Sequence, residues 1–207
     1  MAYGFLDIAL TPSVRAAQAA MGSDAFWRDF KGHRAFDRFT EREAAFITER
    51  DSFYMATVSE TGWPYVQHRG GPRGFLKRLD ERTLAFLDYR GNRQYISAGN
   101  VAANDRACLF LMDYAQRARL KIYVRAEVLA LDFDPDLTRR LTEPAYRAKP
   151  ERIFRLHLES FDWNCSQHIT PRYTEEEVSQ AVQPLRERLQ AVKSEVERLR
   201  GRTSNDG

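Results

Sequence analysis

Six short extended segments, separated by turn residues, constrain the fold of this chain more than any other feature of its sequence. The first two are joined by "ETGWP", which is typical of a hairpin turn. The third, "TLAFLDY", is apolar almost throughout, as expected for a strand covered on both faces. Six strands with few helices predict a mainly β fold with flanking helices, either a barrel or a sandwich. The segments cover residues 53–59, 65–69, 83–89, 106–114, 119–131 and 152–163.

Helices are predicted before, between and after these strands. Thr40, followed three residues later by Glu43, forms a capping-box pattern, and the apolar residues behind it predict a short helix over 41–50. Three more helices are expected from Pro12 to Gly22, over 92–103 and over 134–141.

The end of the chain carries a different pattern, in which apolar residues are spaced alternately four and three apart. This spacing is that of a coiled-coil seam. Pro184 lies inside the pattern and would kink or restart a helix, so the secure part begins at Leu185. Two interpretations stay open: an amphipathic helix that packs on its own domain, or one that pairs with a partner helix. The apolar residues are Val178, Val182, Leu185, Leu189, Val192, Val196 and Leu199.

Charge is unevenly distributed along the chain. The net charge is only +3, but residues 65–125 contain 12 Lys or Arg against 5 Asp or Glu, a local charge of +7. An excess of this kind attracts an anion, which could be nucleic acid, a phosphorylated cofactor or the acidic side chains of a neighbouring segment.

The number of cysteines and the hydropathy of the chain predict the cellular compartment. Cys108 and Cys165 are too few for a disulfide framework and too far apart in sequence for a metal knuckle, which fits a reducing environment. The first residues lack the features of a signal peptide, and no apolar run reaches the length of a membrane span. We therefore expect a cytoplasmic protein that does not interact with membranes.

The stretch "LDYRGNRQYISAGN" is the first candidate binding site. A strand that ends in Asp88, a glycine turn and a helix that begins near Asn92 would place free backbone N–H groups and the positive end of a helix dipole together. Arg93 could then form two hydrogen bonds to a phosphate, and Asn92 and Gln94 could donate from their amides. The alternative is an ordinary helix cap without a ligand.

The stretch "QHRGGPRG" is the second candidate. Gln67, His68 and Arg69 end a strand, and the paired glycines after them would let the backbone approach a flat ligand closely. The alternative is an irregular connector with a histidine that is satisfied within the fold.

The stretch "DWNCSQHITPR" is the third candidate, because it is too polar for a core strand and too aromatic for a solvent loop. Cys165 and His168 are weak candidates for a catalytic pair, since Pro171 favours an irregular path. His68, His157 and His168 have no spacing typical of metal ligands, and we expect no metal. The candidate binding residues here are Trp163, Gln167, His168 and Arg172.

In the order of these parts, the chain resembles the pyridoxamine 5'-phosphate oxidase superfamily of FMN-binding split β-barrels, over most of residues 40–172. The resemblance rests on "FYMATVSETGWPYVQHRGG", "TLAFLDYRGNRQYISAGNVAAN", "RACLFLMDY", "RLKIYVRAEV" and "WNCSQHITPR", the last of which is similar to a subgroup of flavin-nucleotide-binding proteins. It implies an FMN-binding split barrel over 40–173. The predicted N-terminal helical extension over 1–39 and the amphipathic helix over 174–207 are additions to the family's pattern.

The same resemblance implies a cofactor and its ligands. Gln67, His68 and Arg69 would border the flavin and its ribityl chain, and Arg119 would lie near the ring. Trp163 and Arg172 would close the site. The whole implied set of FMN-binding residues is Gln67, His68, Arg69, Asp88, Asn92, Arg93, Gln94, Asn100, Arg119, Trp163, Gln167, His168 and Arg172.

The resemblance also implies a homodimer with the flavins at the subunit interface, and an oxidoreductase that acts on a small substrate through the cofactor, without a protein nucleophile. Gln94 stands where the oxidases have a lysine, and their C-terminal substrate-binding pattern of arginine and histidine is not recognisable. These departures weigh against pyridoxamine phosphate as the substrate, and the sequence leaves the substrate open. The alternatives are a binding module or a haem-handling split barrel with His68 or His168 as iron ligand, or a barrel that binds RNA or single-stranded DNA.

Overall fold

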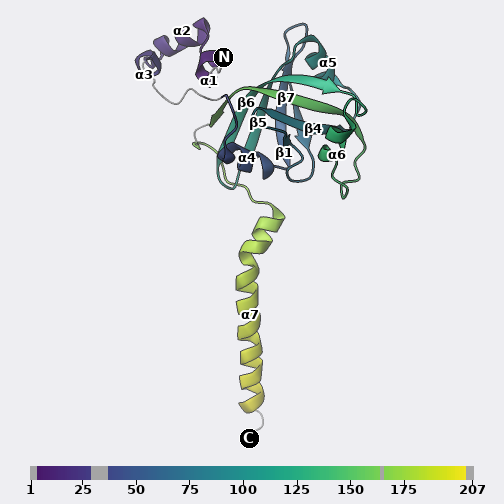
Figure 1. Ribbon diagram of the computed structural model, residues 1–207. Helices are drawn as coiled ribbons and strands as arrows, with labels where there is room; N and C mark the ends of the chain where they lie inside the picture. The colour runs from purple at the N-terminus through teal and green to yellow at the C-terminus, as the bar shows by residue number, and fades with distance from the viewer. Residues whose placement is uncertain (1–3, 29–36, 164–165, 204–207) are drawn as a thin grey trace. The chain divides into compact units, whose positions relative to one another are not determined.

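The computed structural model describes residues 4–28, 37–163 and 166–203. In these residues seven strands form one antiparallel sheet in the order β2-β1-β5-β6-β7-β4-β3, and Figure 1 shows the sheet wrapped into a barrel. The six predicted strands are confirmed, and a two-residue strand, β3, is added to them. The strands are β1 (Ser52–Val58), β2 (Pro64–Gly70), β3 (Lys77–Arg78), β4 (Thr83–Tyr89), β5 (Arg106–Asp113), β6 (Ala118–Leu129) and β7 (Pro150–Trp163).

Alternation along the strands decides which side chains fill the barrel. Phe53 and Met55 of β1 are buried, whereas Tyr54 between them is exposed. On the neighbouring strands β4 and β7, the rings of the paired residues Phe86 and Phe154 stack with their centroids 5.1 Å apart. Apolar side chains from five strands fill the interior, so the barrel has a packed core.

The run "TLAFLDY" forms β4, which is covered on both faces as the sequence predicts. One face lies in the barrel core. On the other, Ala85 and Leu87 pack with Ile153 of β7 against Leu137 and Leu141 of α6 (Pro135–Leu141). The side chain of Asp134 caps α6 by accepting the backbone N–H of Leu137 at 2.9 Å.

Most predicted helices are present, and one begins later than expected. The helix predicted over 92–103 starts only at Ile96, because the Asn92 side chain accepts the backbone N–H of Gln94 at 3.1 Å and holds a local turn. Arg93 and Tyr95 have φ angles of 63° and 56°, which an α-helix does not allow. The helices are α1 (Phe5–Ala9), α2 (Pro12–Ala20), α3 (Asp24–Arg28), α4 (Glu41–Thr48), α5 (Ile96–Ala103), α6 and α7 (Glu175–Thr203).

The chain forms two compact units. The first comprises Met1–Asp113 and Ala118–Gln167 and contains the barrel, and the second comprises Tyr114–Arg117 and His168–Gly207. In the second unit, α7 is one helix that includes Pro184. Within the described residues, no helix combines the length and the apolarity that crossing a bilayer requires.

Glu43 joins the start of α4 to the end of β7. Its side chain is 3% exposed, accepts the backbone N–H and the hydroxyl of Thr40, and accepts the indole N–H of Trp163 at 2.6 Å. Burial raises the pKa of Glu43, but these hydrogen bonds outweigh burial and hold the pKa below its ordinary value. The capping box that the sequence predicts is therefore part of a contact between distant segments.

Replacing Glu43 by Ala should lower the free energy of unfolding by about 1–3 kcal/mol, because it leaves the indole N–H of the partly buried Trp163 without its partner. The lowered pKa makes this stabilisation complete near neutral pH and removes it as the pH falls through the pKa of folded Glu43. Urea unfolding at several pH values measures both effects. Glu43→Gln, which keeps an acceptor for Trp163, should lose less. An equal loss in both variants, independent of pH, would contradict this role.

Candidate functional site

The barrel is split along one side. β2 pairs only with β1, and β3 and β4 end the other edge of the sheet, so in the described residues no backbone ladder joins β2 to β4. Side chains make the connection instead. Arg69 of β2 forms an ion pair with Asp88 of β4, with Nη1 and Oδ1 2.5 Å apart and both side chains about nine-tenths buried. The candidate site lies at this split.

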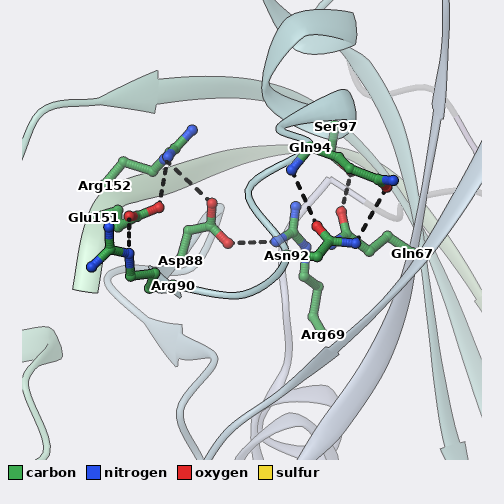
Figure 2. Close-up of polar contacts among 9 residues, drawn as sticks. All are labelled: Gln67, Arg69, Asp88, Arg90, Asn92, Gln94, Ser97, Glu151 and Arg152. Atoms are coloured by element: carbon green, nitrogen blue, oxygen red, sulfur yellow. Dashed lines mark hydrogen bonds and ion pairs between the residues drawn. The ribbon is translucent and has the colours of Figure 1, made fainter. Parts of the chain in front are cut away.

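The ion pair is part of a longer chain of charges, shown in Figure 2. Arg152 of β7 approaches the second oxygen of Asp88 at 3.4 Å and contacts Glu151 at 3.1 Å. Glu151 is in turn paired with Arg90 at 3.3 Å. Arg152 also lies over the ring of Tyr95, 4.2 Å from its centroid. The two carboxylates are therefore each held between two arginines, which fixes their positions.

Two polar contacts attach α5 to the edge strand β2 and to its neighbour β1. The hydroxyl of Ser97 donates to Gln67 Oε1 at 2.8 Å, and the side-chain amide of Asn100 donates to the hydroxyl of Thr57 at 3.0 Å. Ser97, Asn100 and Thr57 are all buried. These contacts fix α5, and with it the end of the loop that follows β4, beside β1 and β2.

A cavity of about 220 Å³ opens between these elements. It brings together, from β2, β4 and the loop after it, most of the residues that the first two sequence clusters singled out. Gln94 does not line it but donates from its backbone to Asn92, as noted above. The lining residues are Gln67, Arg69, Asp88, Tyr89, Gly91, Asn92, Arg93, Tyr95, Ala98 and Glu151.

Burial governs the electrostatics of the central pair. Burial raises the pKa of Asp88, an effect that Arg69 and Arg152 only partly offset. Burial likewise lowers the pKa of Arg69. The Nε atom of Arg69 is buried and, within the described residues, has no hydrogen-bond partner. A buried donor without a partner is costly, so this N–H is an unmet hydrogen-bonding group of a residue that lines the cavity.

Arg93 differs from the other arginines of the site. It pairs with no carboxylate within the described part of the chain, while the hydroxyl of Tyr95 accepts a hydrogen bond from it and raises its pKa. Its backbone lies outside α5, so the prediction that it sits at a helix start is wrong. It nevertheless lines the cavity, where the charge of Glu151 acts on it without forming an ion pair and also raises its pKa.

Two predicted residues lie on the other face of the sheet. His68 is exposed and packs against Tyr54, with ring centroids 5.6 Å apart, because it alternates with Gln67 and Arg69 along β2. Arg119 of β6 pairs in register with Met112 of β5. Its neighbour Leu120 points into the core, so Arg119 points outward. The structure therefore does not bring His68 and Arg119 to the cavity of the same chain.

Trp163 and Asn100 have structural partners instead of a place in the cavity lining. Trp163 donates to Glu43, packs edge-on against Phe46 with centroids 4.8 Å apart, and lies under Arg42. Asn100 is bound to Thr57. Both side chains connect helices to the barrel.

The remaining candidates follow β7. Gln167 is exposed and belongs to the barrel unit, whereas His168 and Arg172 belong to the second unit. His168 is exposed with a φ of 61°, and Arg172 lies 4.9 Å from the centroid of the Tyr114 ring. Asn164 and Cys165 lie outside the described residues. Within the described ranges, no three His, Cys, Asp or Glu side chains gather as metal ligands.

Sequence reasoning missed Glu151 and Arg152, which complete the charge chain from the start of β7. They are about sixty residues from Asp88, and "KPERIF" contains no motif that marks them. Only the register that pairs Asp88 with Arg152 brings them to the site. Tyr95 was also missed, because its role depends on a left-handed backbone that the predicted helix would have excluded.

These features define a split β-barrel with an arginine-rich cavity at the split. A family model described as pyridoxamine 5'-phosphate oxidase matches residues 39–161, more than half of the chain. The chain belongs to the pyridoxamine 5'-phosphate oxidase family. A comparison with curated proteins gives no match.

Solved structures share this fold at low sequence identity. HupZ of Group A Streptococcus is 13% identical, with a TM-score of 0.50 over 65% of this chain and 99% of that chain. A protein related to general stress protein 26, from Clostridium acetobutylicum, is 13% identical, with a TM-score of 0.46 over 67% and 95%. An FMN-binding protein from Syntrophomonas wolfei is 11% identical, with a TM-score of 0.45 over 74% and 95%.

Replacing Asp88 by Asn should lower the free energy of unfolding by about 3–5 kcal/mol, because it leaves the buried charge of Arg69 uncompensated. In Arg69→Met/Asp88→Asn the buried charge is removed as well, and much of the stability should return, since the Met side chain can pack on Phe86 and Phe154. Denaturant unfolding of the single and double variants measures the coupling. Additive losses would show that the pair does not close the barrel.

Proposed function

We propose that this protein is an FMN-binding flavoprotein and that the cavity at the split holds the phosphate end of the cofactor. The observation that carries the proposal is the combination, in one cavity lining, of two arginines with spare donors: within the described residues, Arg93 forms no ion pair and the buried Nε of Arg69 has no hydrogen-bond partner. Arginines that donate from several N–H groups are suited to phosphate oxygens. Asn92 and Gln67 add amide groups to the same lining.

The charge balance supports a dianion. Arg69 and Arg93 line the cavity together with the carboxylates of Asp88 and Glu151. Arg90 and Arg152 pair with these carboxylates from outside the lining. Four positive and two negative groups leave a surplus of two positive charges, which matches a phosphate monoester of nearly two negative charges at neutral pH. Because the carboxylates are held by arginines on both sides, they need not repel the ligand directly.

The size of the cavity limits what it can hold. At about 220 Å³ it is smaller than the roughly 300–1,000 Å³ typical of a pocket for a whole small ligand. It accommodates the phosphate and part of the ribityl chain, so the flavin ring needs a further surface. In a homodimer that surface would come in part from the second subunit, and His68, Arg119 and Trp163 of that subunit remain candidates to contact the ring.

The outer face of the sheet supports a homodimer. Tyr54, Val58 and Val66 are exposed there at 39%, 37% and 60%, and Trp63 in the β1–β2 turn is exposed at 76%. A largely apolar groove of about 580 Å³ runs over β1, β5 and β6 on this side. Apolar side chains gathered on one face mark an interaction surface, and here the proposed occupant is a second copy of the chain.

The proposed reaction is an oxidation or reduction of a small molecule in the cytoplasm. Bound FMN supplies the hydride or electron transfer. The protein's part is to bind the phosphate with Arg93 and Arg69, to fix those arginines through Asp88 and Glu151, and to exclude water from the covered part of the cofactor. The visible spectrum of the purified protein, recorded before and after addition of NADH or NADPH, tests the proposal. Flavin absorption bands that bleach on addition would support it. A haem spectrum would contradict it and indicate a haem-binding protein instead.

Replacing Arg93 by Ala should weaken FMN binding by about 1.5–3 kcal/mol, the range for a hydrogen bond to a charged group. Riboflavin, which lacks the phosphate, should bind Arg93→Ala and the unaltered protein equally. Calorimetric titration of the apoprotein with both compounds measures the difference. Arg139→Ala, which removes an exposed arginine of α6, is the control and should leave both affinities unchanged. A loss of riboflavin affinity as large as that of FMN would place the phosphate elsewhere.

Replacing Val66 by Glu should separate the proposed homodimer, because it puts a charge into the apolar outer face without touching the core. Light scattering should give twice the chain mass for the unaltered protein and the single chain mass for Val66→Glu, with less bound FMN. Glu60→Gln in the β1–β2 turn provides a control that should stay dimeric. A monomeric unaltered protein with full flavin content would rule the homodimer out.

A further inference from the structure

The C-terminal helix α7 carries an interaction surface that the proposed flavin chemistry does not use. The helix begins with a capping box, in which Glu177 accepts the backbone N–H of Thr174 at 2.7 Å and its hydroxyl at 3.0 Å. Glu175, Glu176 and Glu177 occupy the first turn, where negative charge stabilises the helix dipole. The sequence itself thus specifies where the helix starts.

One stripe of α7 is apolar, and we call it the tail seam. It consists of Val178, Val182, Leu185, Leu189, Val192 and Val196, spaced alternately four and three apart. Leu185, Leu189 and Val192 are exposed at 68%, 56% and 54%. Apolar residues at strict a and d positions make a narrow seam that fits another helix.

The flanks of the tail seam are basic. With Val182, Leu189 and Val196 at a positions, Arg186 and Lys193 are at e and Arg188 is at g. The sequence continues with arginines at 200 and 202, the next e and g positions. Glu195 is the one acidic residue at a flanking position, and it is already paired with Arg198.

This charge pattern disfavours a second copy of the helix as the partner. In a parallel pair, Arg188 of one copy would lie beside Lys193 of the other, and in an antiparallel pair the e positions, Arg186 and Lys193, would face each other. Like charges that face each other at e and g positions destabilise the pair of helices and so select against that partner. A helix with acidic flanks would make favourable pairs with all three.

A lipid surface fits less well. Helices that lie on membranes have a broad apolar face with aromatic residues, whereas Glu175–Thr203 contains no aromatic residue. The tail seam is only the width of the a and d positions, and four of its six residues are the short residue valine. Its apolar area is therefore suited to a helix and too small for stable insertion.

We propose that the tail seam docks an amphipathic helix of another protein, with apolar residues at a and d and Asp or Glu at e and g. The pairing is a short two-stranded coiled coil. The apolar residues of the seam supply its affinity, and Arg186, Arg188 and Lys193 supply its selectivity. The tail seam shares no residue with the lining of the proposed FMN site, so either proposal can be wrong without affecting the other.

The test uses the full-length protein and two synthetic peptides of about four heptads, both with Leu at a and d, one with Glu and one with Lys at e and g. Fluorescence anisotropy should show the acidic peptide binding at least about tenfold more tightly, because several exposed charge pairs each add a little. Leu189→Asp should abolish binding, whereas Gln190→Asp, which adds the same charge one residue away from the seam, should reduce it only slightly. Arg188→Glu/Lys193→Glu should reverse the preference.

Three outcomes would overturn the proposal. The first is equal binding of the two peptides, or binding of neither. The second is a lower mass of Leu189→Asp than of the unaltered protein in light scattering, which would identify a second copy of α7 as the partner. The third is stronger binding to phosphatidylserine vesicles than to the acidic peptide, which would identify a lipid surface. Flavin content, measured in parallel, should be unchanged in every tail variant.

Discussion

The ion pair between Arg69 and Asp88 is the contact on which the rest of this structure depends. The sheet begins at β2 and ends at β3 and β4, and side chains rather than backbone hydrogen bonds close it. A closed ladder would leave no space between β2 and β4. Because the closure is made by a charged pair, the barrel keeps a polar cavity at this point, beside an otherwise apolar interior. The constraint that completes the fold therefore also creates the candidate site.

Much of the fold could be predicted from local sequence. Alternation and turn residues indicated six strands, and Thr40 with Glu43 indicated the start of α4, because these signals depend only on neighbouring residues. The start of α5 was predicted wrongly because Asn92 holds a turn that competes with the helix. Glu151 and Arg152 were missed since only the register of β7 with β4 brings them to Asp88.

The candidate site was predictable only in part, because some of its residues lie close together in the sequence and others do not. Gln67, Arg69, Asp88, Asn92 and Arg93 come together because two strand ends and one loop meet at the split. His68 alternates to the outer face, and Trp163 is bound to Glu43. The position of His68 follows from strand periodicity and could have been predicted from the sequence. The position of Trp163 depends on a partner 120 residues away and could not. A site shared between two subunits would account for residues on both faces of the sheet.

The central claim is that the split of the barrel binds the phosphate of FMN. A crystal structure of the protein reconstituted with FMN tests it most directly. The account predicts phosphate density in the cavity between β2 and β4, within hydrogen-bond distance of Arg93 and of the Nε atom of Arg69. Phosphate density anywhere else, with this cavity filled by water, would contradict it.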